Sequence, residues 1–198
     1  MAIAENCSDT SAPGPDLDAA MLPPMPALLS DPLAYIAAEH GGQRALCNLM
    51  ENLAGAASFD RDIAQAILRY LDGHFMRHVH DEENDLFPLL RQRCRPEDEI
   101  ETALGRLNAE HKNEHRLAGD FAIRLKELLG QDDPVIDDAM RERLFQYARS
   151  LRRHLTLENS VILPLARARL TPDDLAALSA AMRKRIEAGA AGAGATRR

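Results

Sequence analysis

The segment His78-Val-His-Asp-Glu82, followed by Pro88, recurs later in the chain as His154-Leu-Thr-Leu-Glu158, followed by Pro164. In both copies the glutamate comes four residues after the histidine, and the proline comes ten residues after it. On an α-helix, residues four apart lie on one face, with about 5–6 Å between their Cβ atoms. Each copy therefore predicts a helix that directs one imidazole and one carboxylate toward the same point.

A Glu-His dipeptide precedes each copy, Glu39-His40 before the first and Glu110-His111 before the second. The chain thus presents four imidazoles and two carboxylates in two similar halves. All six side chains fall on the inward-facing seams predicted for their helices, between apolar residues. Because ionisable side chains rarely lie inside a core unless they are paired or bound to metal, the pattern predicts a buried metal site.

The hydrophobic periodicity around these motifs predicts an all-α fold. Apolar residues recur at spacings of three and four, and no stretch shows the period-two alternation of a strand. We expect four long helices over about residues 30–54, 58–93, 96–129 and 133–169, and a short fifth helix over about 171–187. Pro88 is expected to kink the second helix. Short connections between amphipathic helices favour an up-down-up-down antiparallel four-helix bundle.

The two ends of the chain differ in composition from this helical region. Residues 1–29 carry several prolines among small residues, and we interpret them as a flexible leader. Residues 188–198 are rich in alanine and glycine, and we interpret them as a disordered tail. The bundle itself is therefore expected over residues 30–187.

Composition excludes several classes of protein. With 198 residues the chain is long enough for one packed domain, and its formal net charge of -7 argues against nucleic-acid binding. No apolar run approaches the ~20 residues of a membrane span, so no membrane association is expected. The three cysteines form no CxxC pair, which argues against a disulfide framework and a thiolate zinc site. Since the N-terminus also lacks a secretory signal, the expected location is the cytoplasm.

The donor set restricts the metal. Imidazole and carboxylate without thiolate suit iron, zinc, copper or manganese. A mononuclear zinc site needs about four ligands, so the donors here exceed it. Two octahedral ions bridged by both glutamates would each receive two imidazoles and two carboxylate oxygens, and an oxo or hydroxo bridge would supply a fifth donor. One position on each ion then stays open, which favours a dinuclear iron centre that binds oxygen species.

The chain resembles the hemerythrin-like, or HHE cation-binding, domain in several motifs: Glu39-His40, His78-x-x-x-Glu82 with Leu86-Phe87-Pro88, Glu110-His111, and His154-x-x-x-Glu158 with Leu163-Pro164. The resemblance covers about residues 30–170. It implies a four-helix bundle with a non-haem di-iron centre, whose two iron ions are ligated by histidines and bridged by glutamates. By this resemblance the metal ligands are His40, His78, Glu82, His111, His154 and Glu158.

The sequence leaves the role of His115 open. It lies one turn after His111, on an expected seam made of Leu104, Leu107, His111, His115, Ala118, Ala122 and Leu125. Oxygen-carrying hemerythrins resemble the chain here, with a His-x-x-x-His on the third helix. If His115 binds, only one iron keeps an open position; otherwise it is a polar residue beside or at the rim of the centre. His74, one turn before His78, also has two interpretations: it is either a metal ligand or a hydrogen-bonded histidine of the core.

Three glutamates that flank the ligand candidates also have two interpretations. Glu39, Glu83 and Glu110 either accept hydrogen bonds from the ligand imidazoles or are ordinary surface charges.

Three functions fit such a centre. The first is reversible binding or sensing of O2, NO or a related small molecule, such as a peroxide. The second is enzymatic, either oxidase-like or peroxidase-like chemistry or iron handling that includes iron–sulfur repair. The wide spacing of the motifs resembles repair-type proteins, but their N-terminal cysteine module has no counterpart, since Cys7 stands alone. The third is an iron or oxygen sensor that acts through a protein partner.

Overall fold

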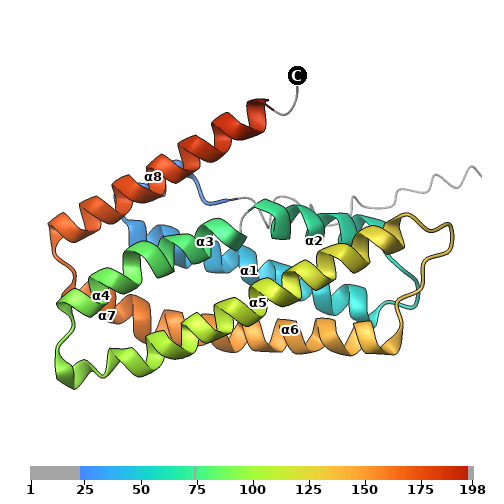
Figure 1. The fold of residues 1–198 in the computed structure, drawn as a ribbon, viewed down its shortest axis with the longest axis horizontal. Helices are drawn as coiled ribbons and strands as arrows, with labels where there is room; N and C mark the ends of the chain where they lie inside the picture. The colour runs from blue at the N-terminus through green and yellow to red at the C-terminus, as the bar shows by residue number, and fades with distance from the viewer. Residues whose placement is uncertain (1–22, 74, 196–198) are drawn as a thin grey trace, which may run out of the picture.

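Four long helical segments lie side by side in the computed structural model, which describes residues 23–73 and 75–195. Successive segments run in opposite directions along the long axis of the molecule (Figure 1). The segments are α1 (Pro32–Gly55); α2 (Arg61–Gly73), α3 (Phe75–Asp81), η3 (Glu82–Leu86) and α4 (Phe87–Arg93); α5 (Ile100–Leu129); and α6 (Asp138–Leu157), η5 (Glu158–Ile162) and α7 (Leu163–Arg169). No strand occurs within the described ranges, so the expectation of an all-α chain is confirmed.

Side-chain caps mark where two of the long helices, α1 and α6, begin. The carboxylate of Asp31 accepts a hydrogen bond from the backbone N–H of Ala34 at 3.0 Å, with Pro32 at the first helical position. Asp137 caps α6 in the same way by accepting from Met140 at 2.7 Å. These contacts satisfy backbone donors that have no partner inside the helix.

Two apolar clusters fill the bundle, one on each side of a polar layer. The first cluster joins the C-terminal half of α1 to α2, the C-terminal half of α5, and α6. The second joins the beginning of α1 to α4, the beginning of α5, α7 and α8. The histidines and glutamates of the repeated motifs lie between the two clusters along the same four segments. Apolar packing on both sides therefore holds the polar side chains at one level of the bundle.

A π-helical turn stands just before each proline of the repeat. The backbone N–H of Phe87 donates to the carbonyl of Glu82, five residues earlier, and Leu163 donates to Glu158 in the same way. A proline has no N–H to donate and clashes with the preceding turn, and the wider π turn accommodates both effects. The sequence predicted only a kink at Pro88; the structure shows the same local device in both copies.

The final helix is longer than the sequence suggested. α8 spans Pro172–Ala195, so it passes the expected end at about residue 187 and includes part of the expected tail. It packs against α1, α3, η3 and the short 3₁₀-helix η2 (Pro26–Ser30). A second 3₁₀-helix, η4 (Pro96–Asp98), precedes α5.

The end of the expected leader belongs to the core. Leu29 is fully buried, and its carbonyl accepts a hydrogen bond from the hydroxyl of Ser179 on α8. Residues 1–22 and 196–198 of the expected leader and tail, and His74, lie outside the described residues. None of the described helices combines the length and apolar character needed to cross a membrane.

Candidate metal centre

The four histidines and two glutamates of the repeated motifs converge in the polar layer. They form two groups in which the potential ligand atoms lie within 4.8 Å of one another: His40, His78, Glu82 and Glu158 in the first, and Glu82, His111, His154 and Glu158 in the second. Each histidine pair combines helices far apart in the sequence, α1 with α3 in the first and α5 with α6 in the second. Both glutamates belong to both groups, so their carboxylates lie between the two histidine pairs.

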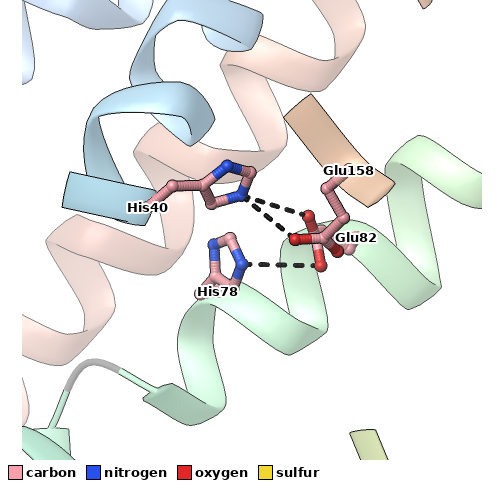
Figure 2. A group of neighbouring side chains, drawn as sticks. All are labelled: His40, His78, Glu82 and Glu158. Atoms are coloured by element: carbon pink, nitrogen blue, oxygen red, sulfur yellow. Dashed lines mark ion pairs between the residues drawn. The ribbon is translucent and has the colours of Figure 1, made fainter. Parts of the chain in front are cut away.

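The first group is drawn in Figure 2, where both imidazoles turn toward the carboxylates. His40 Nε2 lies 3.4 Å from Glu158 Oε2 and 3.8 Å from Glu82 Oε1. His78 Nε2 lies 3.5 Å from Glu82 Oε2. One cation placed among these atoms would therefore meet two imidazole nitrogens and an oxygen from each glutamate.

The second group repeats this arrangement on the other side of the carboxylates. His111 Nε2 lies 3.3 Å from Glu82 Oε2, and His154 Nε2 lies 3.0 Å from Glu158 Oε1. The two Nε2 atoms are only 3.2 Å apart and face the same space. Glu158 thus turns one oxygen toward each histidine pair, which is the geometry of a bridging carboxylate.

Burial leaves these polar atoms without ordinary partners. All six side chains belong to residues at most 3% exposed. Among the described residues, both oxygens of Glu82, both oxygens of Glu158 and the Nε2 atoms of His40 and His78 accept or donate no hydrogen bond. A buried polar group without a partner costs about 1–3 kcal/mol, so a cluster of them calls for an explanation. The residues present fit a pair of cations that would satisfy these atoms together.

Comparison with protein families supports this fit. The model of the hemerythrin HHE cation-binding domain matches residues 31–166, which include all six convergent side chains. The chain belongs to the hemerythrin HHE cation-binding family. Membership implies cation binding, and the His/Glu groups are where this member of the family could hold metal. A search of curated proteins finds no relative that matches the chain.

Three of the imidazoles in this hemerythrin-family chain are oriented by a further carboxylate. Nδ1 of His78 donates to Glu39 at 3.0 Å. Nδ1 of His111 donates to Glu83 at 3.0 Å, and Nδ1 of His154 donates to Glu110 at 3.1 Å. A proton held on Nδ1 leaves the Nε2 lone pair free for a metal, and the carboxylate makes the ring more basic. The sequence left these glutamates open, and the structure places all three against imidazoles.

His40 differs from the other three histidines. Neither of its ring nitrogens has a hydrogen-bond partner among the described residues, and the residue is fully buried. No carboxylate orients its ring, which instead lies edge-to-face against the ring of His78 with centroids 5.2 Å apart. This asymmetry distinguishes the two halves of the site.

Charge within the layer shifts the pKa values of its members. Burial lowers the pKa of His78, but the carboxylates of Glu82 and Glu39 outweigh burial and raise it to about 10. The same competition, with Glu158 as the main carboxylate, raises the pKa of His154 to about 9. Burial raises the pKa of Glu82, but the surrounding imidazoles hold it well below its usual value. A cation bound near neutral pH would therefore compete with protons for these imidazole nitrogens.

The structure places His115 outside both groups. His115 is exposed on α5, whereas Glu114 is 1% exposed and points inward. The seam of α5 alternates spacings of three and four, so it passes through Leu107, His111 and Glu114, and position 115 falls beside it. Ala122 of the expected seam is likewise replaced by Phe121.

Glu114 is the inward residue that sequence reasoning missed. Its Oε1 lies 3.8 Å from His154 Nδ1, and neither of its oxygens has a hydrogen-bond partner among the described residues. Burial raises the pKa of Glu114 to about 7. The strict three–four alternation along α5 is the signal that would have found it.

Proposed function

We propose that the chain is a non-haem di-iron protein that binds O2, NO or a related small molecule. His40 and His78 would hold one iron, His111 and His154 would hold the other, and Glu82 and Glu158 would bridge them. The observation that carries this proposal is that both glutamates belong to both ligand groups. The same proposal takes the four long segments as an up-down-up-down bundle of the hemerythrin type, with α8 as an addition.

The donor count supports two ions with open positions. Each group offers two imidazole nitrogens and oxygens from two carboxylates, which leaves positions for a further bridge and a ligand on an octahedral ion. A bound iron pair would supply reversible one-electron chemistry toward oxygen species. The protein supplies orientation, through Glu39, Glu83 and Glu110, and exclusion of water, through apolar clusters on both sides.

Burial supports a small ligand. All six candidate ligand residues are at most 3% exposed, so a large substrate cannot contact the centre without rearrangement of the helices. A diatomic molecule or a peroxide needs only a narrow path. The proposed location is the cytoplasm, which the odd number and unpatterned spacing of the cysteines in the sequence support.

Glu114 favours a second candidate, an oxidase-like or peroxidase-like enzyme. Reduction of oxygen species consumes protons, and Glu114 is a buried carboxyl beside His154 with no other partner among the described residues. Glu114 lies at Nδ1 of His154, on the outer side of the ring, so it can supply a proton next to the ligand layer rather than directly to a molecule bound between the metals. Reversible binding has no such requirement, so Glu114 separates the two candidates.

Rapid mixing of the anaerobically reduced, iron-loaded protein with O2 or with peroxide tests both candidates. A charge-transfer band that forms with O2 and disappears on its removal supports reversible binding. Rapid irreversible oxidation with peroxide turnover, slowed in Glu114→Gln, supports the enzyme and rejects the carrier. Absence of any change in the iron spectrum with O2, NO and peroxide would reject both.

A further inference from the structure

α8 is tied to the turn that carries the candidate ligand Glu82. Nε of Arg185 donates to Asp81 Oδ1, and its Nη2 donates to Asp85 Oδ2. Asp81 immediately precedes Glu82, and Asp85 lies within the same π turn. One guanidinium from the last helix therefore holds both ends of the turn that presents Glu82 to the centre.

Asp81 depends on this contact. It is fully buried, and its Oδ2 has no hydrogen-bond partner among the described residues. A buried carboxylate without a paired cation is strongly destabilising, and Arg185 supplies that cation. Loss of the guanidinium would leave the Asp81 carboxyl without its cation directly beside Glu82. The carboxyl would then take up a proton or move toward water, and in both cases the turn would lose the contacts that hold it.

The second half of the repeat is a natural comparison. The positions that match Asp81 and Asp85 are Leu157 and Val161, and neither can pair with an arginine. Both π turns share another feature, a hydrogen bond from a side chain to the carbonyl four residues earlier. Asn84 donates to the carbonyl of His80, and Ser160 donates to that of Thr156. The arginine contact is thus an addition to the first turn, not a requirement of π turns in this fold.

General docking of α8 has separate contacts. Near its beginning, Asp174 accepts two hydrogen bonds from Arg93, at 2.8 and 3.0 Å. Leu178 and Met182 are buried in the second apolar cluster. Arg93 lies on α4, outside the π turn, so its contact with Asp174 provides a control for the role of Arg185.

We propose that Arg185 is a positioning residue for Glu82, and that metal binding and the docking of α8 reinforce each other through it. The proposal rests on the dinuclear centre proposed above. Thermodynamic linkage makes this effect reciprocal. If docked α8 favours the metal-bound position of Glu82, bound metal favours docked α8 by the same factor. A partner that binds undocked α8 would then respond to the metal content of the centre.

Metal release tests the positioning role. The protein is loaded anaerobically with ferrous iron and mixed with an excess of a coloured ferrous chelator, which reports the number of ions released and their rate. Arg185→Ala is expected to release iron about 10-fold faster or more, the range for residues that orient ligands. Arg185→Lys keeps the positive charge but loses the two guanidinium nitrogens that contact Asp81 and Asp85 together, so its rate of iron release should be intermediate. Arg183→Ala, an exposed neighbour, and Arg93→Ala should stay within about twofold of the wild type.

Hydrogen exchange of the α8 backbone tests the reciprocal effect. Iron should slow exchange in the second half of α8 in the wild type and have little effect there in Arg185→Ala, while circular dichroism checks that both chains are folded. Unchanged release in Arg185→Ala, or equal acceleration in Arg93→Ala, would overturn the positioning role. If iron does not change the rate of hydrogen exchange in wild-type α8, the coupling is overturned. A wild type that binds no iron would instead reject the dinuclear centre itself.

Discussion

Replacement of Glu39 with glutamine should weaken metal binding at the first ligand group without unfolding the chain. The Glu39 carboxylate holds Nδ1 of His78 at 3.0 Å, and its side chain is only 6% exposed. In such a poorly solvated place, the charge of the carboxylate strengthens the hydrogen bond and the basicity of the ring. The expected loss is about 10- to 100-fold in metal affinity, or about 1.4–2.7 kcal/mol.

The same reasoning orders the three carboxylates. Glu110 holds His154 with a side chain 22% exposed, and Glu83 holds His111 with one 32% exposed. Solvent weakens both contacts relative to that of Glu39, so the loss of affinity should fall in the order Glu39→Gln, Glu110→Gln, Glu83→Gln. Burial sets this order, because the three hydrogen bonds have nearly equal lengths. Arg106 also donates to Glu110 at 2.8 Å, and Arg77 lies 4.0 Å from Glu39.

A competition titration measures these losses. Each variant is titrated anaerobically with ferrous iron in the presence of a chelator of known affinity, and circular dichroism confirms that it is folded. Glu101→Gln is a matched control, because this glutamate is 69% exposed and its partner among the described residues is Arg91 at the surface. Wild-type affinity in Glu39→Gln, or a loss in the control as large as in Glu39→Gln, would refute the reasoning.

Three further outcomes are expected. Because the pKa values of His78 and His154 are raised to about 10 and about 9, their contribution to apo-protein stability is complete below pH 6.5 and lost as the pH rises through 9–10; denaturant titrations at pH 6.5 and 10 should show the fall. Glu114→Gln removes a carboxyl whose pKa burial raises to about 7, so the apo variant should be about 1–3 kcal/mol more stable than the wild type at pH 8.5, and equal stability would contradict the burial of this charge. Glu82→Ala and Glu158→Ala should each lose the dinuclear spectrum on iron loading; two coupled ions in both variants would show that the bridges are wrongly assigned.

Much of the ligand layer could be predicted from the sequence because its spacing is local. His78 and Glu82 are four residues apart on one helix, as are His154 and Glu158, so helical geometry alone places each pair on one face. The apolar turns on both sides of each pair indicate that the face points inward. The structure brings these pairs together with His40 and His111, which the sequence also placed on inward-facing seams.

The predicted inward seam of α5 was wrong at positions where two neighbouring residues could each have faced inward. On α5 the positions three and four after His111 are both close to the inward seam, and only the alternation along the whole helix assigns Glu114 inside and His115 outside. The pattern of apolar residues nearby was compatible with either choice. A longer window would have decided in favour of Glu114 and Phe121.

Long-range contacts could not be predicted from a single sequence. Nothing near Arg185 indicates that it meets Asp81 and Asp85, about a hundred residues earlier in the chain. Likewise, the proline at position 88 indicates an irregular turn but does not determine whether the helix kinks or widens into a π turn. Such features depend on which helices the fold places side by side.

X-ray diffraction from crystals of the iron-loaded protein, measured at the iron absorption edge, tests the central claim most directly. The account predicts two anomalous peaks about 3.5–4 Å apart, the separation common in two-metal sites. One peak should lie beside His40 and His78, the other beside His111 and His154, with Glu82 and Glu158 contacting both. A single peak, or two peaks that share neither glutamate, would contradict the account.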